Sequence, residues 1–466
     1  MQPSVLLGGV VGMVALAGEV NGQIQKIPEF EPAVVIGVGS FPWGIAAGDA
    51  LGPPLEPNDL DGYPEIAVAV GQLNLYRLIP GDWTGETGQV VVFRNTQNWT
   101  NPADGLDFAQ VIELDEVHPN TISADVKWAD MDGDDRLDLV ISATTHFDSS
   151  SAGGAWGIYV YRYAGGVEPF EFLDYEPTTY PVRGLTVADF DNDGDMDVAA
   201  AVDLLEESLP EFARDYISII KNDGTGHLLP EDLYDLASDS SEPTTAVVAG
   251  LFDKTPGGAT LPDLFTSRWD WSDGVSMTNL DGTSYSMTFT APSCASWNFT
   301  DIAVGRFTSG KLVDDVVGLS GDGTLSVLHG DGNAGFIHDC SGGNQDDIYL
   351  STSGGAPLTL VPGGLDVGHL NAGTKQDIVV ATGGDAGNAT ATILLGNGDG
   401  TFQYNRLNGG YFIDLGVLAH RPLRITIADL DQDGFGDIIS SNHGETINDV
   451  GTISVLINTF ELISLP

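Results

Sequence analysis

The feature that most constrains this chain is a short acidic sequence that returns along its length. It reads ADMDGDDRLDL at 129–139, ADFDNDGDMDV at 188–198 and ADLDQDGFGDI at 428–438. Weaker versions begin near Asp49, Gly250, Gly305 and Gly368, so that neighbouring copies are mostly about 60 residues apart. A regular period of this length is typical of repeat architectures. The sequence therefore predicts one array of seven units rather than several unrelated domains.

Each unit has the same order of short apolar segments. A segment such as RGLTVAD (183–189) leads into the acidic or glycine-rich loop, one such as MDVAAAV (196–202) leaves it, and a third such as YISIIKN (216–222) follows. β-Branched segments separated by Asn, Asp and Gly turns are typical of antiparallel strands, and a looser fourth segment completes the unit. We therefore predict an all-β fold, a seven-bladed β-propeller of four-stranded antiparallel blades.

The two ends of the chain are expected to close this ring. After the last acidic loop only two strands remain, GDIISSN (436–442) and TISVLINT (452–459), so the seventh unit lacks a fourth. The segment EPAVVIGV (31–38) precedes the first unit and can fill that place. Pairing the N- and C-terminal strands would remove an exposed sheet edge. The propeller is predicted over residues 28–466.

The first residues predict export. An apolar run from Val5 ends in Ala15-Leu16-Ala17, a small-x-small pattern suited to signal peptidase, so we predict a signal peptide at 1–17 and a short linker at 18–27. The protein is then secreted, extracellular or periplasmic. No Lys or Arg precedes the run, which leaves a disordered N-terminal tail as the alternative. In an exported protein Cys294 and Cys340 could form a disulfide; free, partly buried thiols are the alternative.

The charge of the chain limits its partners. Lys and Arg number 17 against 67 Asp and Glu, a formal net charge of −50, so a phosphate backbone would be repelled and nucleic acid is not an expected partner. No segment is apolar for long enough to cross a bilayer. The sequence contains no clear oligomer interface, and we expect a monomer.

The acidic loops have the chemistry of a cation site. Counted from the first Asp of each loop, carboxylates stand at positions 1, 3, 5 and 9, and Gly194 or Gly434 stands at position 6. Oxygen ligands of high charge on a tight loop suit Ca²⁺, whereas Zn²⁺ prefers His and Cys. The three complete sets are Asp130, Asp132, Asp134 and Asp138; Asp189, Asp191, Asp193 and Asp197; and Asp429, Asp431, Asp433 and Asp437. Solvated acidic turns are the alternative interpretation. An EF-hand is excluded because position 12 falls inside a strand.

The other four units depart from this pattern. In the first unit an insertion separates Asp49 from Asp59, Asp61 and Glu65, and we treat these four residues as a possible fourth Ca²⁺ site. Units four to six have lost most of the acids and gained Lys254, Lys311 and Lys375. Because an ammonium group can replace the charge of a metal ion, we expect these three loops to be metal-free.

These loops resemble a known family. The acidic loop followed by an apolar strand, together with ILLGNGDGTF at 393–402, resembles the FG-GAP/VCBS repeat proteins, which include the seven-bladed propeller of integrin alpha subunits. The resemblance covers about residues 28–466 and implies a Ca²⁺-stabilised propeller with metal in the loops between the first and second strands. The family includes adhesion proteins, lectin-like modules and some polysaccharide-active enzymes, so membership does not define a function.

The connections between second and third strands are the expected ligand-binding face. They are long and varied, as loops that bind partners usually are. The candidate ligand residues in them are Trp83, His146, Trp156, Arg268, Trp269, Asp270, Trp271 and His443. Trp269 and Trp271 could stack on sugar rings, although core packing explains them equally well. We expect a binding or adhesion module for a carbohydrate or an extracellular protein. A polysaccharide lyase or another carbohydrate-active enzyme is the alternative, and no motif of a known catalytic class is present.

Overall fold

The structure of the chain is a computed structural model that describes most of the repeat region. The described residues are 19–20, 23–24, 28–39, 42–51, 61–71, 88–118, 121–145, 156–202, 216–236, 244–253, 261–268, 274–278, 286–290, 299–338, 346–350, 363–371, 375–383, 389–403, 411–416, 421–443 and 451–459. The signal peptide predicted at 1–17 lies outside them, as do Cys294 and Cys340. Within the predicted linker, β1 (Glu19–Val20) pairs with β2 (Gln23–Ile24).

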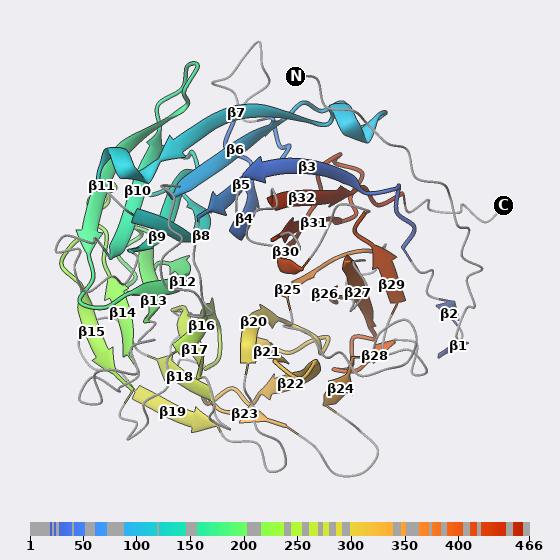
Figure 1. Cartoon of the computed structure of the whole chain (residues 1–466). Helices are drawn as coiled ribbons and strands as arrows, with labels where there is room; N and C mark the ends of the chain where they lie inside the picture. Colours follow the sequence, from blue (N-terminus) through green and yellow to red (C-terminus); the bar gives the residue numbers. More distant parts are fainter. Residues whose placement is uncertain are drawn as a thin grey trace, which may run out of the picture.

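The remaining strands form seven antiparallel sheets arranged as a ring, which confirms the predicted seven-bladed propeller (Figure 1). Blade 1 holds β4 (Pro42–Gly48), β5 (Glu65–Val70), β6 (Gln89–Asn95) and β7 (Leu106–Glu113); blade 2 holds β8 (Thr121–Ala129), β9 (Asp138–Thr145), β10 (Gly157–Tyr163) and β11 (Phe170–Pro177). Blade 3 holds β12 (Val182–Ala188), β13 (Asp197–Val202), β14 (Tyr216–Ile220) and β15 (Asp232–Asp235); blade 4 holds β16 (Thr244–Gly250), β17 (Asp263–Arg268), β18 (Gly274–Thr278) and β19 (Ser286–Thr290).

In blades 5 and 6 the outer position is shared by two short strands. Blade 5 holds β20 (Phe299–Gly305), β21 (Asp315–Ser320) and β22 (Thr324–Gly330), which pairs with β23 (Phe336–Ile337) and β24 (Asp347–Tyr349). Blade 6 holds β25 (Leu365–Gly368), β26 (Asp377–Gly383) and β27 (Ala389–Gly396), which pairs with β28 (Phe402–Gln403) and β29 (Tyr411–Asp414). The described helices are two 3₁₀ turns beside β7, η1 (Pro102–Asp104) and η2 (Leu114–Glu116).

Blade 7 joins the two ends of the propeller, as predicted. It holds β30 (Pro422–Ala428), β31 (Asp437–Asn442) and β32 (Gly451–Leu456), and the N-terminal strand β3 (Val34–Gly39) supplies its outer edge. β3 pairs antiparallel with β32, with Ile36 opposite Ile453. The backbone N–H of Thr459 extends the pairing by donating to the carbonyl of Glu29 at 2.7 Å. Closure therefore rests on backbone pairing between the two ends of the propeller.

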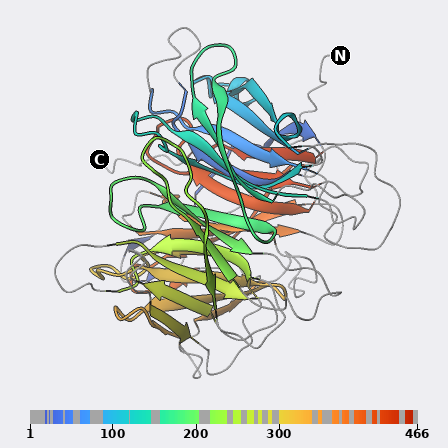
Figure 2. The ribbon, with the colours of Figure 1, turned by 90° about the vertical axis from the view of Figure 1, so that its left-hand side faces the viewer.

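The core lies between neighbouring blades rather than inside any one of them. One apolar cluster joins Ile66 and Val68 of blade 1 to Ile439 and Ile453 of blade 7, and equivalent clusters lie between other neighbours. The side view in Figure 2 shows the strands of successive blades stacked in this way. Since both faces of a sheet are covered by its neighbours, the second strands of blades 1, 3, 5 and 7 are buried at every residue.

A buried acid begins the second strand of all seven blades. We call these residues the clamp carboxylates: Glu65, Asp138, Asp197, Asp263, Asp315, Asp377 and Asp437. Each is at most 2% exposed. One oxygen accepts the backbone N–H of a buried apolar residue in the preceding loop, at 2.7 to 3.1 Å. In six blades the other oxygen accepts a backbone N–H at or after the end of the third strand. Each clamp thus holds the loop against the sheet.

The loop residue held by the clamp also contacts the next blade. Met131 donates its N–H to Asp138 of its own blade, and its carbonyl accepts from Asn222 Nδ2 of blade 3 at 2.7 Å. The same arrangement joins Leu430 to Asn95 at 2.8 Å and Leu370 to Asn458 at 2.9 Å. In blades 4 and 5 the carbonyls of Phe252 and Phe307 accept backbone N–H groups of the following blade. Blade-to-blade contact is therefore built on the loops that carry the acidic motif.

Substitution of Asn222 by Ala should destabilise the propeller. The buried carbonyl of Met131 would lose its donor, and an unsatisfied buried acceptor costs about 1–3 kcal/mol. Asn101→Ala is the matched control because Asn101 is exposed and, among the described residues, its side chain bonds to Asp104 of its own turn. Urea unfolding of both variants measures the difference. Equal free energies of unfolding for the two variants would contradict a role for this contact between blades.

Candidate metal centre

Each complete acidic loop makes two left-handed turns between the first and second strands of its blade. At position 6, φ is +66° for Asp135, +100° for Gly194 and +91° for Gly434. At position 4, φ is +76° for Gly133, +62° for Asn192 and +57° for Gln432. Glycine adopts this region at no steric cost and Asn tolerates it well. The predicted turn at position 6 is confirmed, whereas sequence reasoning missed the turn at position 4.

These turns aim backbone N–H groups at the first Asp of the loop. In blade 2 the carboxylate of Asp130 accepts the N–H groups of Gly133 at 2.8 Å, Asp134 at 3.1 Å and Asp135 at 2.9 Å. In blade 3 the N–H of Gly194 donates to Asp189 at 3.1 Å, and in blade 7 that of Gly434 donates to Asp429 at 2.9 Å. The first carboxylate is therefore held in place by its own loop.

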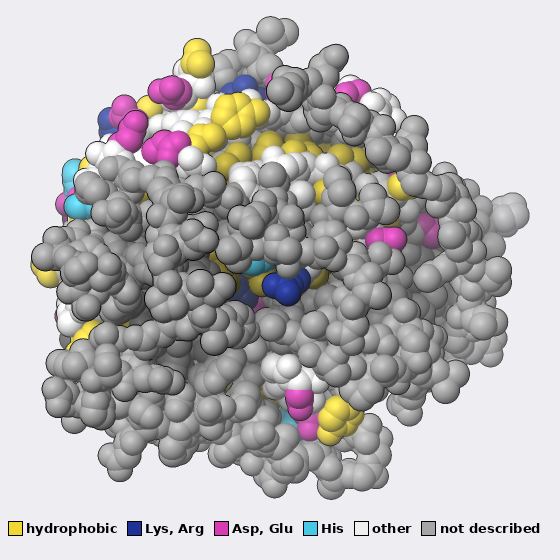
Figure 3. Space-filling model, in the orientation of Figure 1, with side chains coloured by type: hydrophobic (Ala, Val, Ile, Leu, Met, Phe, Trp, Pro, Cys, Tyr) yellow, Lys and Arg dark blue, Asp and Glu magenta, His cyan; other side chains and the backbone are white. Residues whose placement is uncertain are grey.

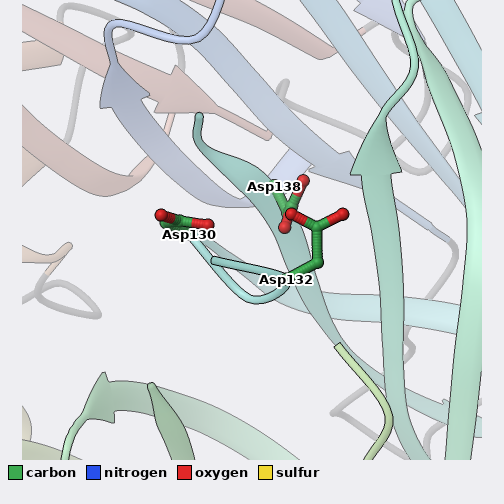
Figure 4. Close-up of side chains that lie close together, drawn as sticks. All are labelled: Asp130, Asp132 and Asp138. Atoms are coloured by element: carbon green, nitrogen blue, oxygen red, sulfur yellow. The ribbon is translucent and has the colours of Figure 1, made fainter. Parts of the chain in front are cut away.

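The loops bring three of their four acids together. The carboxylates at positions 1, 3 and 9 lie within 4.8 Å of one another, and we call each such group an Asp triad: Asp130, Asp132 and Asp138; Asp189, Asp191 and Asp197; Asp429, Asp431 and Asp437. Figure 4 shows the side chains of the blade 2 triad, with Asp132 and Asp138 next to each other and Asp130 to one side; two come from the loop and Asp138 comes from β9. The strand carries the third ligand to the loop because the clamp carboxylate is itself position 9.

The acids at position 5 lie outside these triads. Instead, Asp134, Asp193 and Asp433 each accept the backbone N–H of the residue two positions further on, at 2.9 to 3.0 Å. Such Asx turns shape the loop at its tip. In the structure, then, positions 1, 3 and 9 hold the donor atoms that face one another, and position 5 helps to fold the loop.

Each Asp triad holds one buried carboxylate oxygen that accepts no hydrogen bond within the described part of the chain. These atoms are Asp132 Oδ1, Asp191 Oδ1 and Asp429 Oδ1. A buried carboxylate oxygen without a donor is costly unless a cation is bound to it. The donor set is oxygen only and high in charge, which fits Ca²⁺ better than the other metals common in proteins. The residues present thus fit the metal that the sequence predicts.

Without a cation the triads are electrostatically strained. Burial raises the pKa of Asp138 to about 7, and Asp132 and Asp134 raise it further against the backbone N–H groups that lower it. Burial likewise raises the pKa of Asp437 to about 8 and that of Asp197 to about 6. Carboxylates in this situation need either a proton or a bound cation near neutral pH.

The first blade holds a different arrangement. Among the described residues, Asp49, Asp61 and Glu65 do not converge as the triads do. Asp49 accepts the N–H of Gly62 at 3.0 Å, and Asp61 accepts Gln97 Nε2 at 2.6 Å. Asp49 Oδ1 is buried and has no hydrogen-bond partner among the described residues, and burial raises the pKa of Glu65 to about 8. Asp59 lies outside the described residues.

Blade 5 supplies cations of its own. Lys311 Nζ lies 2.9 Å from Oδ1 of the clamp carboxylate Asp315 and 3.2 Å from the carbonyl of Gly330. His329 lies between Asp315 and Asp346, at 3.7 and 3.5 Å. The Lys311 ammonium thus stands beside the clamp carboxylate of a loop that has lost its other acids. In blade 6 the charge of Lys375 contributes to lowering the pKa of Asp377, although burial dominates and raises it to about 6. Lys254 lies outside the described residues.

The predicted ligand face is described only in part. Trp83, His146, Trp269, Asp270 and Trp271 lie outside the described residues, and of Arg268 only the backbone at the end of β17 is described. The carbonyl of Trp156 accepts the Tyr175 hydroxyl at 2.9 Å. The ring of His443 lies 6.2 Å from that of Trp43, and its backbone N–H donates to Arg421. A ligand site formed by these residues stays a prediction.

A cavity lies at the centre of the ring, between the inner strands of the blades. Its volume is about 250 Å³, and the inner strands of all seven blades line it. Its charged residues are Asp125, Lys127, Asp301, Asp366 and Arg424. Figure 3 shows basic and His side chains near the middle of one face. The three acids accept backbone N–H groups of the next blade, those of Leu185, Leu365 and Ile427. Arg424 lies 3.0 Å from Asp301. These charges therefore hold the inner strands together.

Sequence reasoning overlooked the clamp carboxylates of blades 4 to 6. Asp263, Asp315 and Asp377 stand where the loops have lost their other acids, yet they make the same backbone contacts as the triad members. The signal was available: in every unit an acid directly precedes the apolar second strand. This single repeated acid is present even in the units whose metal loops are incomplete.

Comparison with known proteins adds little to this geometry. No protein-family model matches the chain, and no curated protein matches it. Among solved structures it is similar to BBS1N from a complex with ARL6DN (TM-score 0.48, 9% identity, 92% of this chain and 96% of that chain). It is also similar to a putative 6-phosphogluconolactonase from Bacteroides uniformis (0.46, 12%, 85% and 95%) and to Penicillium chrysogenum alpha-L-arabinanase complexed with arabinobiose (0.45, 9%, 92% and 99%). Because these TM-scores are below 0.5, nothing about fold or function is inferred from the similarities. The number of blades is established by the strand pairing. No helix among the described residues could span a membrane.

His329 should make stability depend on pH. Burial alone would lower its pKa, but Asp315 and Asp346 outweigh this effect and raise the pKa to about 9, from 6.5 for an unperturbed histidine. Because the folded state binds the proton more tightly, the stabilisation is complete below pH 6.5 and is lost as the pH rises through about 9. We expect His329→Gln to lose about 3 kcal/mol of stability at pH 6.5 and little at high pH.

Urea unfolding across this pH range measures the effect as the difference between wild type and variant, which cancels the titration of other groups. His227→Gln is the control because the His227 side chain is 55% exposed. A constant difference between wild type and His329→Gln at all pH values would show that the imidazolium does not stabilise blade 5.

Proposed function

We propose that the chain is an FG-GAP/VCBS-type β-propeller whose second, third and seventh blades each bind one Ca²⁺, and that it acts as a secreted binding or adhesion module. The observation that carries the proposal is the set of three Asp triads, each with a buried carboxylate oxygen that has no donor within the described residues. Bound Ca²⁺ would neutralise carboxylates that otherwise repel one another. The ion would be held by positions 1, 3 and 9 of each loop.

The role proposed for Ca²⁺ is structural. Position 9 is the clamp carboxylate, so an ion bound there would tie the loop to the sheet at the point where the next blade also makes contact. Ions held in this way would stiffen the whole ring. Blades 2 and 7 lie on either side of blade 1, whose repeat unit is the longest in the sequence, so calcium would stabilise the two blades that flank it.

Binding is proposed for the face formed by connections between the second and third strands. Long, varied loops on a rigid ring are suited to recognise a carbohydrate or an extracellular protein. A carbohydrate-active enzyme is the second candidate. Trp156 directly precedes β10 and His443 directly follows β31, so each stands at the end of one of these connections, and propeller sites can take single residues from separate blades. The two candidates differ in whether a bound polysaccharide is cleaved.

Removal of Ca²⁺ should lower the melting temperature. A site saturated at about 100 times its Kd stabilises a fold by about 2.7 kcal/mol, so loss of several sites should give a large shift. Asp132→Asn should remove one of the bound ions, counted by metal analysis after gel filtration. Asp322→Asn is the control, since Asp322 is an exposed turn residue of blade 5. A protein that retains no Ca²⁺ and shows no chelator-dependent shift would refute the metal proposal.

Incubation with a panel of polysaccharides in the presence of Ca²⁺ should give retention without new sugar ends. Retention is measured by co-sedimentation and cleavage by a reducing-end assay and by absorbance of unsaturated products. Release of ends would instead establish the enzyme. Failure to retain any polysaccharide, with no cleavage, would leave an extracellular protein as the ligand of the proposed module.

A further inference from the structure

One position differs in charge among the three blades that carry an Asp triad. It directly precedes the residue whose backbone N–H donates to Oδ1 of the clamp carboxylate: Tyr163 in blade 2, Asn222 in blade 3 and Asn458 in blade 7. The residues at this position are Arg162, Lys221 and Ile457. Equivalent places in the three blades thus hold an arginine, a lysine and an uncharged residue.

Lys221 contacts the blade 3 triad directly. Its Nζ donates to Asp191 Oδ2 at 3.0 Å. The two side chains are 21% and 16% exposed, so water screens this pair much less than it screens a surface ion pair. The ammonium group therefore holds one oxygen of a carboxylate whose other oxygen, Oδ1, is buried without a donor within the described residues.

The counterparts of Lys221 leave their triads unpaired. Arg162 is turned to the outer strand β11, where its Nε donates to Glu171 Oε1 at 2.7 Å, and both side chains are about half exposed, at 45% and 51%. Ile457 is 4% exposed and packs in the core between blades 7 and 1. Across the described residues, no Lys or Arg forms an ion pair with the triads of blades 2 and 7.

We infer that Lys221 is a built-in cation that competes with Ca²⁺ for the blade 3 site, so that blades 2 and 7 load with metal first. The inference rests on the proposed calcium sites. An ion entering the blade 3 triad meets an ammonium already bound to one of its oxygens and must displace it, while the two positive charges repel each other. In blade 5 the equivalent position, before Gly330, holds His329, which lies 3.7 Å from Asp315. Lys311, from the loop that has lost the other acids, lies 2.9 Å from the same carboxylate, so basic side chains of the chain itself stand beside this clamp carboxylate.

Calorimetric titration of the metal-free full chain with Ca²⁺ tests the inference. We expect two tight sites and one weaker site in the wild type. Lys221→Met keeps the length of the side chain and removes its charge, so it should tighten the weak site by about tenfold or more. Arg162→Met is the matched control at the equivalent position of blade 2 and should change no site by as much, because Arg162 pairs with Glu171.

Two further variants assign the sites to blades. Asp189→Asn should abolish the weak site alone, whereas Asp429→Asn should abolish one of the tight sites. Metal analysis of each purified variant gives the number of bound ions independently of heat. The melting temperature of each metal-free variant shows whether it folds.

The possible results separate this inference from the proposed function. Three equal sites in the wild type, unchanged in Lys221→Met, would overturn the competition but leave the calcium proposal intact. A blade 3 site that is still weak or missing in Lys221→Met would also overturn it. Absence of Ca²⁺ binding in every form of the folded protein would refute the proposed function itself.

Discussion

The propeller depends on one buried carboxylate per blade. An acid at the start of the second strand is almost fully shielded from water in all seven blades, yet it is satisfied by backbone N–H groups from the preceding loop and, in six blades, from the region where the third strand ends. A buried carboxylate is costly to leave unpaired, so these donors have to be in place when the blade folds. In five of the blades the residue held by the clamp also accepts a hydrogen bond from the next blade, which couples the fold of those blades to the position of their neighbours.

The charge of this carboxylate also explains why the loops differ. Blades 2, 3 and 7 place two more carboxylates beside it, an arrangement that calls for a cation, whereas blade 5 places Lys311 and His329 there. Blade 3 combines both solutions, with an Asp triad and Lys221. Blades 2, 3, 5 and 7 therefore differ in what neutralises the carboxylates beside the clamp: the proposed Ca²⁺ in blades 2 and 7, basic side chains in blade 5, and Lys221 in competition with the proposed Ca²⁺ in blade 3.

The clamp carboxylates hold each loop against its sheet, and in the proposed function the Asp triads add bound Ca²⁺ to the same loops while other loops recognise the ligand. The axial cavity follows the same logic, since its acids accept backbone N–H groups of the next blade and Arg424 pairs with Asp301. The connections between second and third strands carry no such fastening pattern in the sequence. Binding modules typically carry their ligand-contacting residues on variable loops that a rigid scaffold holds in place, and the proposed function follows this pattern.

The sequence by itself determined the blades, their number and the closure by β3, because strand periodicity, turn residues and a repeat of about 60 residues are local patterns that need no tertiary context. It also located the acids of the triads. Only the tertiary structure decided that positions 1, 3 and 9 converge while Asp134, Asp193 and Asp433 fold the loop, because the direction of a side chain depends on the left-handed turns at positions 4 and 6. It alone revealed the contacts between Lys221 and Asp191 and between Asn222 and Met131, since these pairs are 30 and 91 residues apart in the chain and meet only when the sheets have formed and packed.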